Sequence, residues 1–293
     1  MSSYCSSDPC RIFRGSKTPA GLYARKRWLN EESTPQWRAD FRSAVESLEQ
    51  GQGVDGSWDH SFVTTVQRLF GLHLTVREPA DCVERALDWL IDTTAETLRE
   101  WRGQPGRFPP AQLQGLPFTP GRLDLLAVGT TLFLASVFGR ERDPWVLSQY
   151  ERLGGEGVER HGRWGGWPSS NNVLRAFVVH PEYCRSEAVA LVVRALAQAQ
   201  RHSGEWPSTV PFYQTVNALA HLDLPEADTQ LDLAFERLRR TQRCDGSWGR
   251  SQREWNTFLV VHALRNKGLL RKNGGEESTP PSRGRNRMHR GKI

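Results

Sequence analysis

This sequence of 293 residues lacks long apolar runs and has no regular spacing of cysteines. No apolar run approaches the roughly 18 residues of a membrane-spanning helix, and no apolar signal-peptide region follows Met1. The five cysteines are scattered and odd in number, which argues against a disulfide framework. We therefore expect a reduced, cytoplasmic protein without a spanning helix.

Several common catalytic signatures are missing as well. The chain has no Gly-rich phosphate loop, no nucleophile elbow and no convincing Ser/His/Asp arrangement. Nucleotide-dependent phosphoryl transfer and serine hydrolysis therefore have no support in the sequence.

The net charge of +6 is located at the two ends of the chain. Residues 1–30 carry six Lys and Arg against one acid, and residues 271–293 carry seven against two. The intervening part, 31–270, has a net charge of −4, so we expect no specific nucleic-acid binding. We expect both ends to be disordered and solvated. The alternative is contact with an acidic partner or peripheral contact with an anionic membrane.

The phrase Gln-x-x-Asp-Gly-Ser-Trp occurs twice, at 52–58 and at 242–248, with degenerate copies at 106–109, 166–168 and 204–207. Repetition at this spacing indicates stacked supersecondary units. In such a turn Gly supplies a positive φ, Asp accepts backbone N–H groups, and the indole packs between neighbouring hairpins. We interpret the following residues as structural: Gln52, Asp55, Trp58, Trp167, Trp206, Gln242, Asp245 and Trp248.

Apolar spacing predicts a helix, a Gly-rich turn and a second helix as the repeating unit. Charged amphipathic helices such as 231–240 alternate with helices that are apolar nearly all round, such as 125–138 and 188–199. This alternation predicts an all-α fold in two concentric layers, with the apolar helices inside. Because neither end of the array has a strong polar cap, we expect the five to six hairpins of 31–270 to close into a barrel.

A long loop is expected between the helices 143–153 and 186–200. It contains Arg163, Trp164 and Trp167, which either form the rim of a cavity or pack in the interior.

The two full repeats, each followed by an apolar helix, resemble the Gln-Trp motif of squalene–hopene and oxidosqualene cyclases and the repeats of protein prenyltransferase β subunits. The resemblance covers about 35–268. It implies an α/α toroid around a deep apolar cavity, in which the Gln-Trp residues fasten the outer layer. It also implies that any chemistry lies at the start of the inner helices.

The acidic motifs of this family are absent. The sequence contains neither Asp-x-Asp-Asp, with which triterpene cyclases protonate their substrate, nor Asp-Asp-x-x-Asp. The nearest single acids at expected inner-helix starts are Asp124, Glu187 and Glu254. Each is either a general acid or simply a favourable charge at a helix N-terminus.

A prenyltransferase-like zinc site is incomplete. Glu182 and Cys184 form an acid-x-Cys pair before an expected inner helix, with His180 close by. Where the family has a His ligand this chain has Asn256, a poor zinc ligand, and His180 and His262 are the alternative ligands. We expect no metal cofactor and treat Cys184 as an inert side chain.

Two functions follow from the resemblance. One is a terpenoid-cyclase-like or prenyltransferase-like enzyme that holds an isoprenoid chain in an aromatic-lined cavity and cyclises it by acid catalysis. The other is a non-catalytic toroid that binds a lipid or a protein partner. The chain has the length of a single toroid, so activity on a long substrate implies a cavity inside it, a homo-oligomer or a partner. The expected cavity residues are Phe62, Tyr183, Phe212, Tyr213, Trp255 and Asn256, whose rings would stabilise carbocations.

Overall fold

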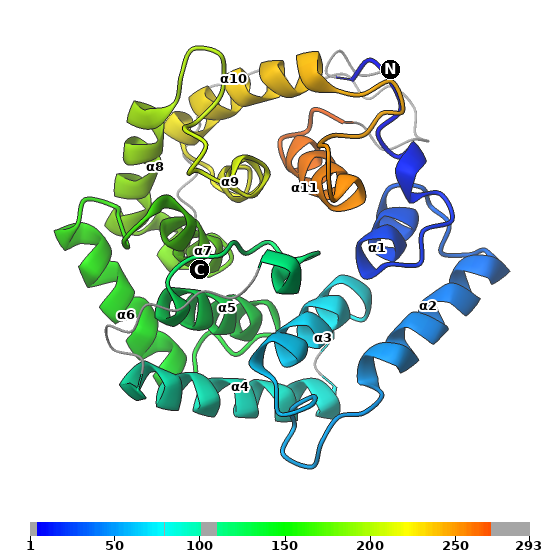
Figure 1. The fold of residues 1–293 in the computed structure, drawn as a ribbon, viewed down its shortest axis with the longest axis vertical. Coiled ribbons are helices and arrows are strands. Elements are labelled where there is room, and N and C mark those ends of the chain that lie inside the picture. Colours follow the sequence, from blue (N-terminus) through cyan, green and yellow to red (C-terminus); the bar gives the residue numbers. More distant parts are fainter. Residues whose placement is uncertain (1–4, 79, 101–109, 271–293) are drawn as a thin grey trace, which may run out of the picture.

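The computed structural model describes residues 5–78, 80–100 and 110–270, and its regular elements are helices. The helices alternate between an inner and an outer ring, which confirms the predicted α/α toroid (Figure 1). The inner ring contains α1 (Pro19–Arg27), α3 (Phe62–Thr75), α5 (Leu123–Val137), α7 (Trp167–Phe177), α9 (Phe212–Leu219) and α11 (Arg253–Asn266). The outer ring contains α2 (Pro35–Glu49), α4 (Asp81–Glu100), α6 (Pro144–Glu159), α8 (Glu187–Ala199) and α10 (Pro225–Thr241), and the 3₁₀ turns are η1 (Arg11–Phe13), η2 (Pro110–Leu113) and η3 (Tyr183–Arg185).

Burial follows the two layers. In α5 every residue from Leu125 to Ala135 is buried, because this helix has neighbours on all sides. In α10 only one stripe is buried, with Leu231, Phe235 and Leu238 spaced three to four residues apart. No helix in the described part of the chain is both long enough and apolar enough to cross a membrane.

The third hairpin differs from the prediction. Helix α8, expected inside, is an outer helix that buries one face. We expected it to be an inner helix because its other face also carries alanines and small apolar residues. The inner helix is α7, which we expected to be a loop. The apolar pattern did not predict this helix because four of its buried residues are polar, namely Ser169, Ser170, Asn171 and Asn172.

Each repeat tryptophan is hydrogen-bonded to the end of the preceding outer helix. The indole Nε1 of Trp58 donates to the carbonyl of Gln50 at 3.2 Å, and that of Trp248 donates to the carbonyl of Leu238 at 2.8 Å. In the third unit this position is held by Trp164, whose Nε1 donates to Leu153 at 2.8 Å. The assignment of Trp167 to the repeat is therefore wrong. Trp206 donates to Leu196 in the same way, at 3.0 Å.

Glutamines of the two full repeats join neighbouring units. The Nε2 of Gln52 donates to the carbonyl of Cys82 at the start of α4, at 2.6 Å. The Nε2 of Gln242 donates to Ser7 at 3.0 Å, and its Oε1 accepts the backbone N–H of Ser6 at 2.8 Å. The last repeat is thus fastened to the N-terminal segment, which closes the ring.

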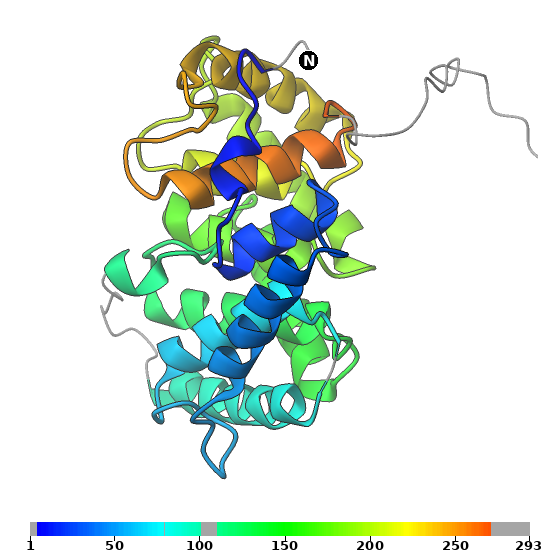
Figure 2. The same cartoon turned by 90° about the vertical axis from the view of Figure 1, so that its right-hand side faces the viewer.

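The expectation that 1–30 is disordered is wrong for residues 5–30. They form η1 and the inner helix α1, which packs between α3 and α11 (Figures 1 and 2). Trp28 is buried against Phe258, and the buried Arg25 pairs with Asp40 at 2.8 Å. The basic residues looked like a tail because their acidic partner lies on another helix. The basic segment 271–293 lies outside the described residues.

Candidate functional site

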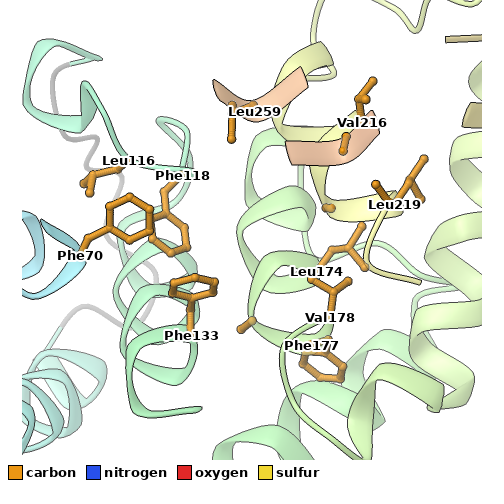
Figure 3. Close-up of a cluster of buried hydrophobic side chains, with 14 of the residues drawn as sticks. Phe70, Leu116, Phe118, Phe133, Leu174, Phe177, Val178, Val216, Leu219 and Leu259 are labelled. Atoms are coloured by element: carbon orange, nitrogen blue, oxygen red, sulfur yellow. The ribbon is translucent and has the colours of Figure 1, made fainter. Parts of the chain in front are cut away.

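A loop closes one end of the inner ring. Its carbonyl at Leu116 accepts the indole N–H of Trp255 at 3.0 Å, and the amide of Asn172 exchanges two hydrogen bonds with the backbone of Thr119 at 2.8 and 2.9 Å. Figure 3 shows Leu116 and Phe118 of this loop against Phe70 of α3. The segment 113–121, called the plug from here on, is therefore anchored to α7 and α11.

A cavity of about 430 Å³ lies beside the plug, between α1, α3 and α11. Its volume falls in the range of roughly 300–1,000 Å³ typical of small-molecule sites. The large apolar side chains of its wall are Phe70, Leu74, Leu116 and Trp255. We call it the side cavity.

Among the described residues, Glu254 is the one acid that lines the side cavity. It lies in the first turn of α11. Its Oε1 accepts a hydrogen bond from Ser16 Oγ at 2.9 Å and another from Thr18 Oγ1. Both hydroxyls belong to the N-terminal segment, so the ordering of that segment creates the environment of this carboxylate.

A second cavity, of about 150 Å³, lies at the centre of the inner ring. It shares Phe70, Leu74 and Trp255 with the side cavity, but the rest of its wall is largely polar and basic. We call it the central cavity. Its polar lining consists of Tyr23, His73, Arg77, Arg175, Asn217, His221 and His262.

Burial keeps the central histidines neutral. It lowers the pKa of His73 from 6.5 to about 3, with Arg77 and Arg175 acting in the same direction. It lowers the pKa of His262 to about 4, again with help from Arg175. Burial also lowers the pKa of Arg175, to about 9, which still leaves the guanidinium charged at pH 7.

Lowering the pH from 7 to 5 is therefore expected to lower the free energy of unfolding. The unfolded chain takes up protons on His73 and His262 near pH 6.5, whereas the folded protein does so only near pH 3 and 4. The contribution of these two neutral histidines to the free energy of unfolding is complete above pH 6.5 and is lost as the pH falls towards 4. Urea midpoints between pH 7.5 and 5 measure this loss.

A matched pair of variants checks the source of the pH effect. His73→Gln is expected to reduce the slope of stability against pH, because one titrating group is removed. His202→Gln, at an exposed position, is the control and should leave the slope unchanged. Equal slopes in all three proteins would show that His73 does not contribute to the effect.

The three predicted acids are in different environments. Asp124, at the start of α5, pairs with Arg122, whose Nε lies 3.1 Å from Oδ1. Glu187 is exposed on the outer helix α8, so its placement at an inner-helix start is wrong. Of the three, Glu254 alone lines one of the two cavities described above.

The predicted cavity aromatics are largely elsewhere. Trp255 lines both cavities, whereas Tyr183 stacks on Tyr150 at 5.0 Å beside the outer helix α6. Phe70 and Phe258 line the central cavity but were not among the predicted cavity residues, and both lie beyond the first turn of their helices. An aromatic residue on the inward face of an inner helix, beyond its first turn, is the sequence signal that could have predicted these cavity residues. Four further predicted residues line neither cavity, namely Phe62, Phe212, Tyr213 and Asn256.

The weak metal candidates follow α7 in the sequence and lie near the outer helix α6, where His180 contacts Tyr150. The Nδ1 of His180 accepts the backbone N–H groups of Glu182 and Tyr183 at 3.1 and 3.2 Å. The thiol of Cys184 donates to the carbonyl of Pro181 at 3.5 Å. Within residues 5–78, 80–100 and 110–270, no three His, Cys, Asp or Glu side chains are grouped as a metal site.

No protein-family model and no curated protein matches the sequence. Among solved structures, the chain is similar to a protein from Actinoplanes, with a TM-score of 0.53 and 18% identity over 86% of this chain and 89% of that one. It is also similar to type II terpene cyclase MstE from Scytonema in complex with geranylgeranyl dihydroxybenzoate, with a TM-score of 0.52 and 14% identity over 87% of each chain. For MstE in complex with merosterolic acid A the TM-score is 0.53, at 14% identity over 87% of this chain and 88% of that one. The chain therefore has the all-α toroid fold of a type II terpene cyclase.

Proposed function

We propose that this protein binds an isoprenoid-like chain in the side cavity and cyclises it by proton transfer from Glu254. The observation that carries the proposal is the position of this acid in a cavity wall that also contains the rings of Phe70 and Trp255. The shared fold supports it, because MstE was solved with a geranylgeranyl compound bound.

The reaction requires an acid and a surface that stabilises a cation. Protonated Glu254 gives its proton to one carbon of an alkene, and positive charge develops on the other carbon. A neighbouring double bond attacks that carbon, and loss of a proton from the final cation restores the acid, so the product is an isomer of the substrate. Ser16 and Thr18 donate hydrogen bonds to Glu254 and thereby stabilise the carboxylate left after proton transfer.

The rings stabilise the developing charge. Phe70 and Trp255 meet edge to face, with ring centroids 5.8 Å apart, and Trp255 stacks on Phe258 at 5.2 Å. An aromatic face attracts a cation most strongly where water is excluded. These rings therefore favour an intermediate that bulk water would capture.

The test is incubation with geranylgeranyl dihydroxybenzoate, geranylgeranyl diphosphate and squalene, followed by chromatography and mass spectrometry. We expect a product with the mass of its substrate, formed at least about 100-fold more slowly by Glu254→Gln. Glu187→Gln, on the outer surface, is the matched control and should keep the wild-type rate. Unchanged substrates throughout, or equal rates for the two variants, would contradict the proposal.

A second candidate function is a lipid carrier. Glu254 is the one acid among the described residues that line the side cavity. The triterpene cyclases that the sequence resembles use several clustered acids, so a single acid favours the carrier. Native mass spectrometry distinguishes the two functions. A retained, chemically unaltered lipid together with an inactive wild type would favour the carrier.

A further inference from the structure

We propose that the central cavity is a binding site for a small oxyanion of the phosphate or carboxylate type. The site is separate from the acid in the side cavity and does not depend on the proposed cyclisation. It rests on a group of cationic and hydrogen-bonding side chains that have no anionic partner in the described structure.

Arg175 is the centre of this site. Only 7% of its surface is exposed, and its Nε and Nη1 atoms are buried without a hydrogen-bond partner. Its guanidinium faces the ring of Phe133 at 5.5 Å. Buried arginines are normally paired with a carboxylate or hydrogen-bonded, because an uncompensated charge is costly to remove from water. Arg175 is thus prepared for a partner that the described residues do not supply.

Other donors converge on the same cavity from several inner helices. His73 comes from α3, Asn217 from α9 and His262 from α11, and His221 follows α9 directly. The Nδ1 of His73 and the Nε2 of His221 are buried without a partner. A neutral imidazole donates from one nitrogen, and a protonated one donates from both. The cavity therefore offers an oxyanion both hydrogen bonds and charge.

The surrounding electrostatic field has one sign. Within the part of the chain that the structure describes, none of the residues that line the central cavity carries a carboxylate. Burial lowers the pKa of His221, and the charged groups that add to the effect are basic, with Arg175 first and Lys267 among them. A metal cation would be repelled by Arg175, whereas an oxyanion would be attracted and would be held in a medium of low dielectric constant.

The size of the site fits a small ion. Its volume of about 150 Å³ is roughly ten times the 10–15 Å³ that holds one water molecule. Water alone would satisfy the unpaired N–H groups but would not neutralise Arg175. An oxyanion does both.

The anion has two possible sources. The central and side cavities share Phe70, Leu74 and Trp255, so an amphiphile with its chain in the side cavity could place an anionic head group at Arg175. A free inorganic ion would reach the same donors without a chain. The chemistry of recognition is the same for both sources.

The first measurement uses the full chain and inorganic diphosphate, titrated by calorimetry at constant ionic strength in chloride. We expect saturable binding that weakens at least 10-fold in Arg175→Met. Arg239→Met is the matched control, because Arg239 is an exposed arginine paired with Glu236, and it should bind as the wild type does. No binding by the wild type, or equal binding by both variants, would overturn the proposal.

Two further readouts keep the test independent of folding defects. In chloride buffer Arg175→Met should be at least as stable as the wild type, since it removes an uncompensated buried charge. His221→Gln, which keeps Arg175, should weaken diphosphate binding without abolishing it. If all variants that fold bind with wild-type affinity, the site is wrong.

The pH dependence supplies a signature that a purely structural role would not produce. A bound oxyanion stabilises the protonated form of the histidines and so raises their depressed pKa values, which means that binding takes up protons and tightens as the pH falls from 7 to 5. The groups that face the ion are Arg175 and Asn217, the histidines 73, 221 and 262, Tyr23 of α1 and Arg77 after α3. Calorimetry in two buffers of different ionisation enthalpy measures the proton uptake, and zero uptake would contradict the role of the histidines.

Competition identifies the source of the anion. If geranylgeranyl diphosphate displaces inorganic diphosphate with at least 10-fold higher affinity, the site holds the head group of an amphiphile. If the two bind equally, the site holds a free ion. Neither result depends on turnover, so the anion site can stand even where no substrate is cyclised.

Discussion

Replacing Trp164 with alanine is expected to lower the free energy of unfolding by about 3–5 kcal/mol, the range of Trp→Ala substitutions in cores. The indole is 1% exposed and donates its N–H to the carbonyl of Leu153 at 2.8 Å. It fills the space over Gly157 and contacts Phe177, with ring centroids 5.8 Å apart. The substitution removes this packing and leaves a cavity between α6 and α7. Urea unfolding at pH 7 measures the change.

The matched control is three residues away. Trp167 is only partly buried, and its ring is covered by the guanidinium of Arg163 at 3.8 Å. Trp167→Ala is therefore expected to cost about 1 kcal/mol, mostly the loss of this cation–π contact. The ratio of the two effects separates the residue that fastens the repeat from its neighbour in sequence. If Trp167→Ala is the more damaging variant, our assignment of the third repeat is wrong.

Gly246→Ala is expected to lower the free energy of unfolding by about 3 kcal/mol, through backbone strain and the loss of packing at the ring closure. Gly246 has a φ of +85°, and a Cβ there would overlap the carbonyl oxygen of Asp8 in the N-terminal segment. The substitution therefore displaces the segment that carries Ser6 and Ser7, the partners of Gln242. Urea unfolding and limited proteolysis of the N-terminal segment measure the effect.

Gly51→Ala separates backbone strain from the close contact. Gly51 has a φ of +81°, but no neighbouring atom lies within 4 Å of the position of a Cβ. The variant is expected to cost about 1 kcal/mol, the penalty for a left-handed alanine alone. Equal losses for Gly51→Ala and Gly246→Ala would mean that the contact with Asp8 does not hold the ring closed.

The inner and outer layers could be predicted where composition differs strongly. Helix α5 is apolar throughout and α10 carries a charged face, so their layers followed from the pattern. Helices α7 and α8 reversed the expectation. The buried Asn172 is satisfied by the plug, through its hydrogen bonds to Thr119, and such a partner cannot be read from local sequence.

The residues of the candidate sites also include some that the sequence predicted and some that it did not. Glu254 and Trp255 were predicted because they begin an apolar helix after a full repeat. Arg175 and His221 were not, because each is a single polar residue in or after a short helix with no motif around it. They are brought together only by the closure of the inner ring, which places distant helix segments around one cavity.

The sequence by itself determined the repeating unit and the all-α toroid, because periodic apolar residues and repeated turns act locally and are repeated along the chain. The tertiary structure alone decided that residues 5–30 close the ring, since Arg25, Trp28 and Ser16 find their partners on α2 and α11. It alone also decided the charge of the central cavity. A cationic site built from several helices depends on which side chains face the same space and on the absence of acids among them.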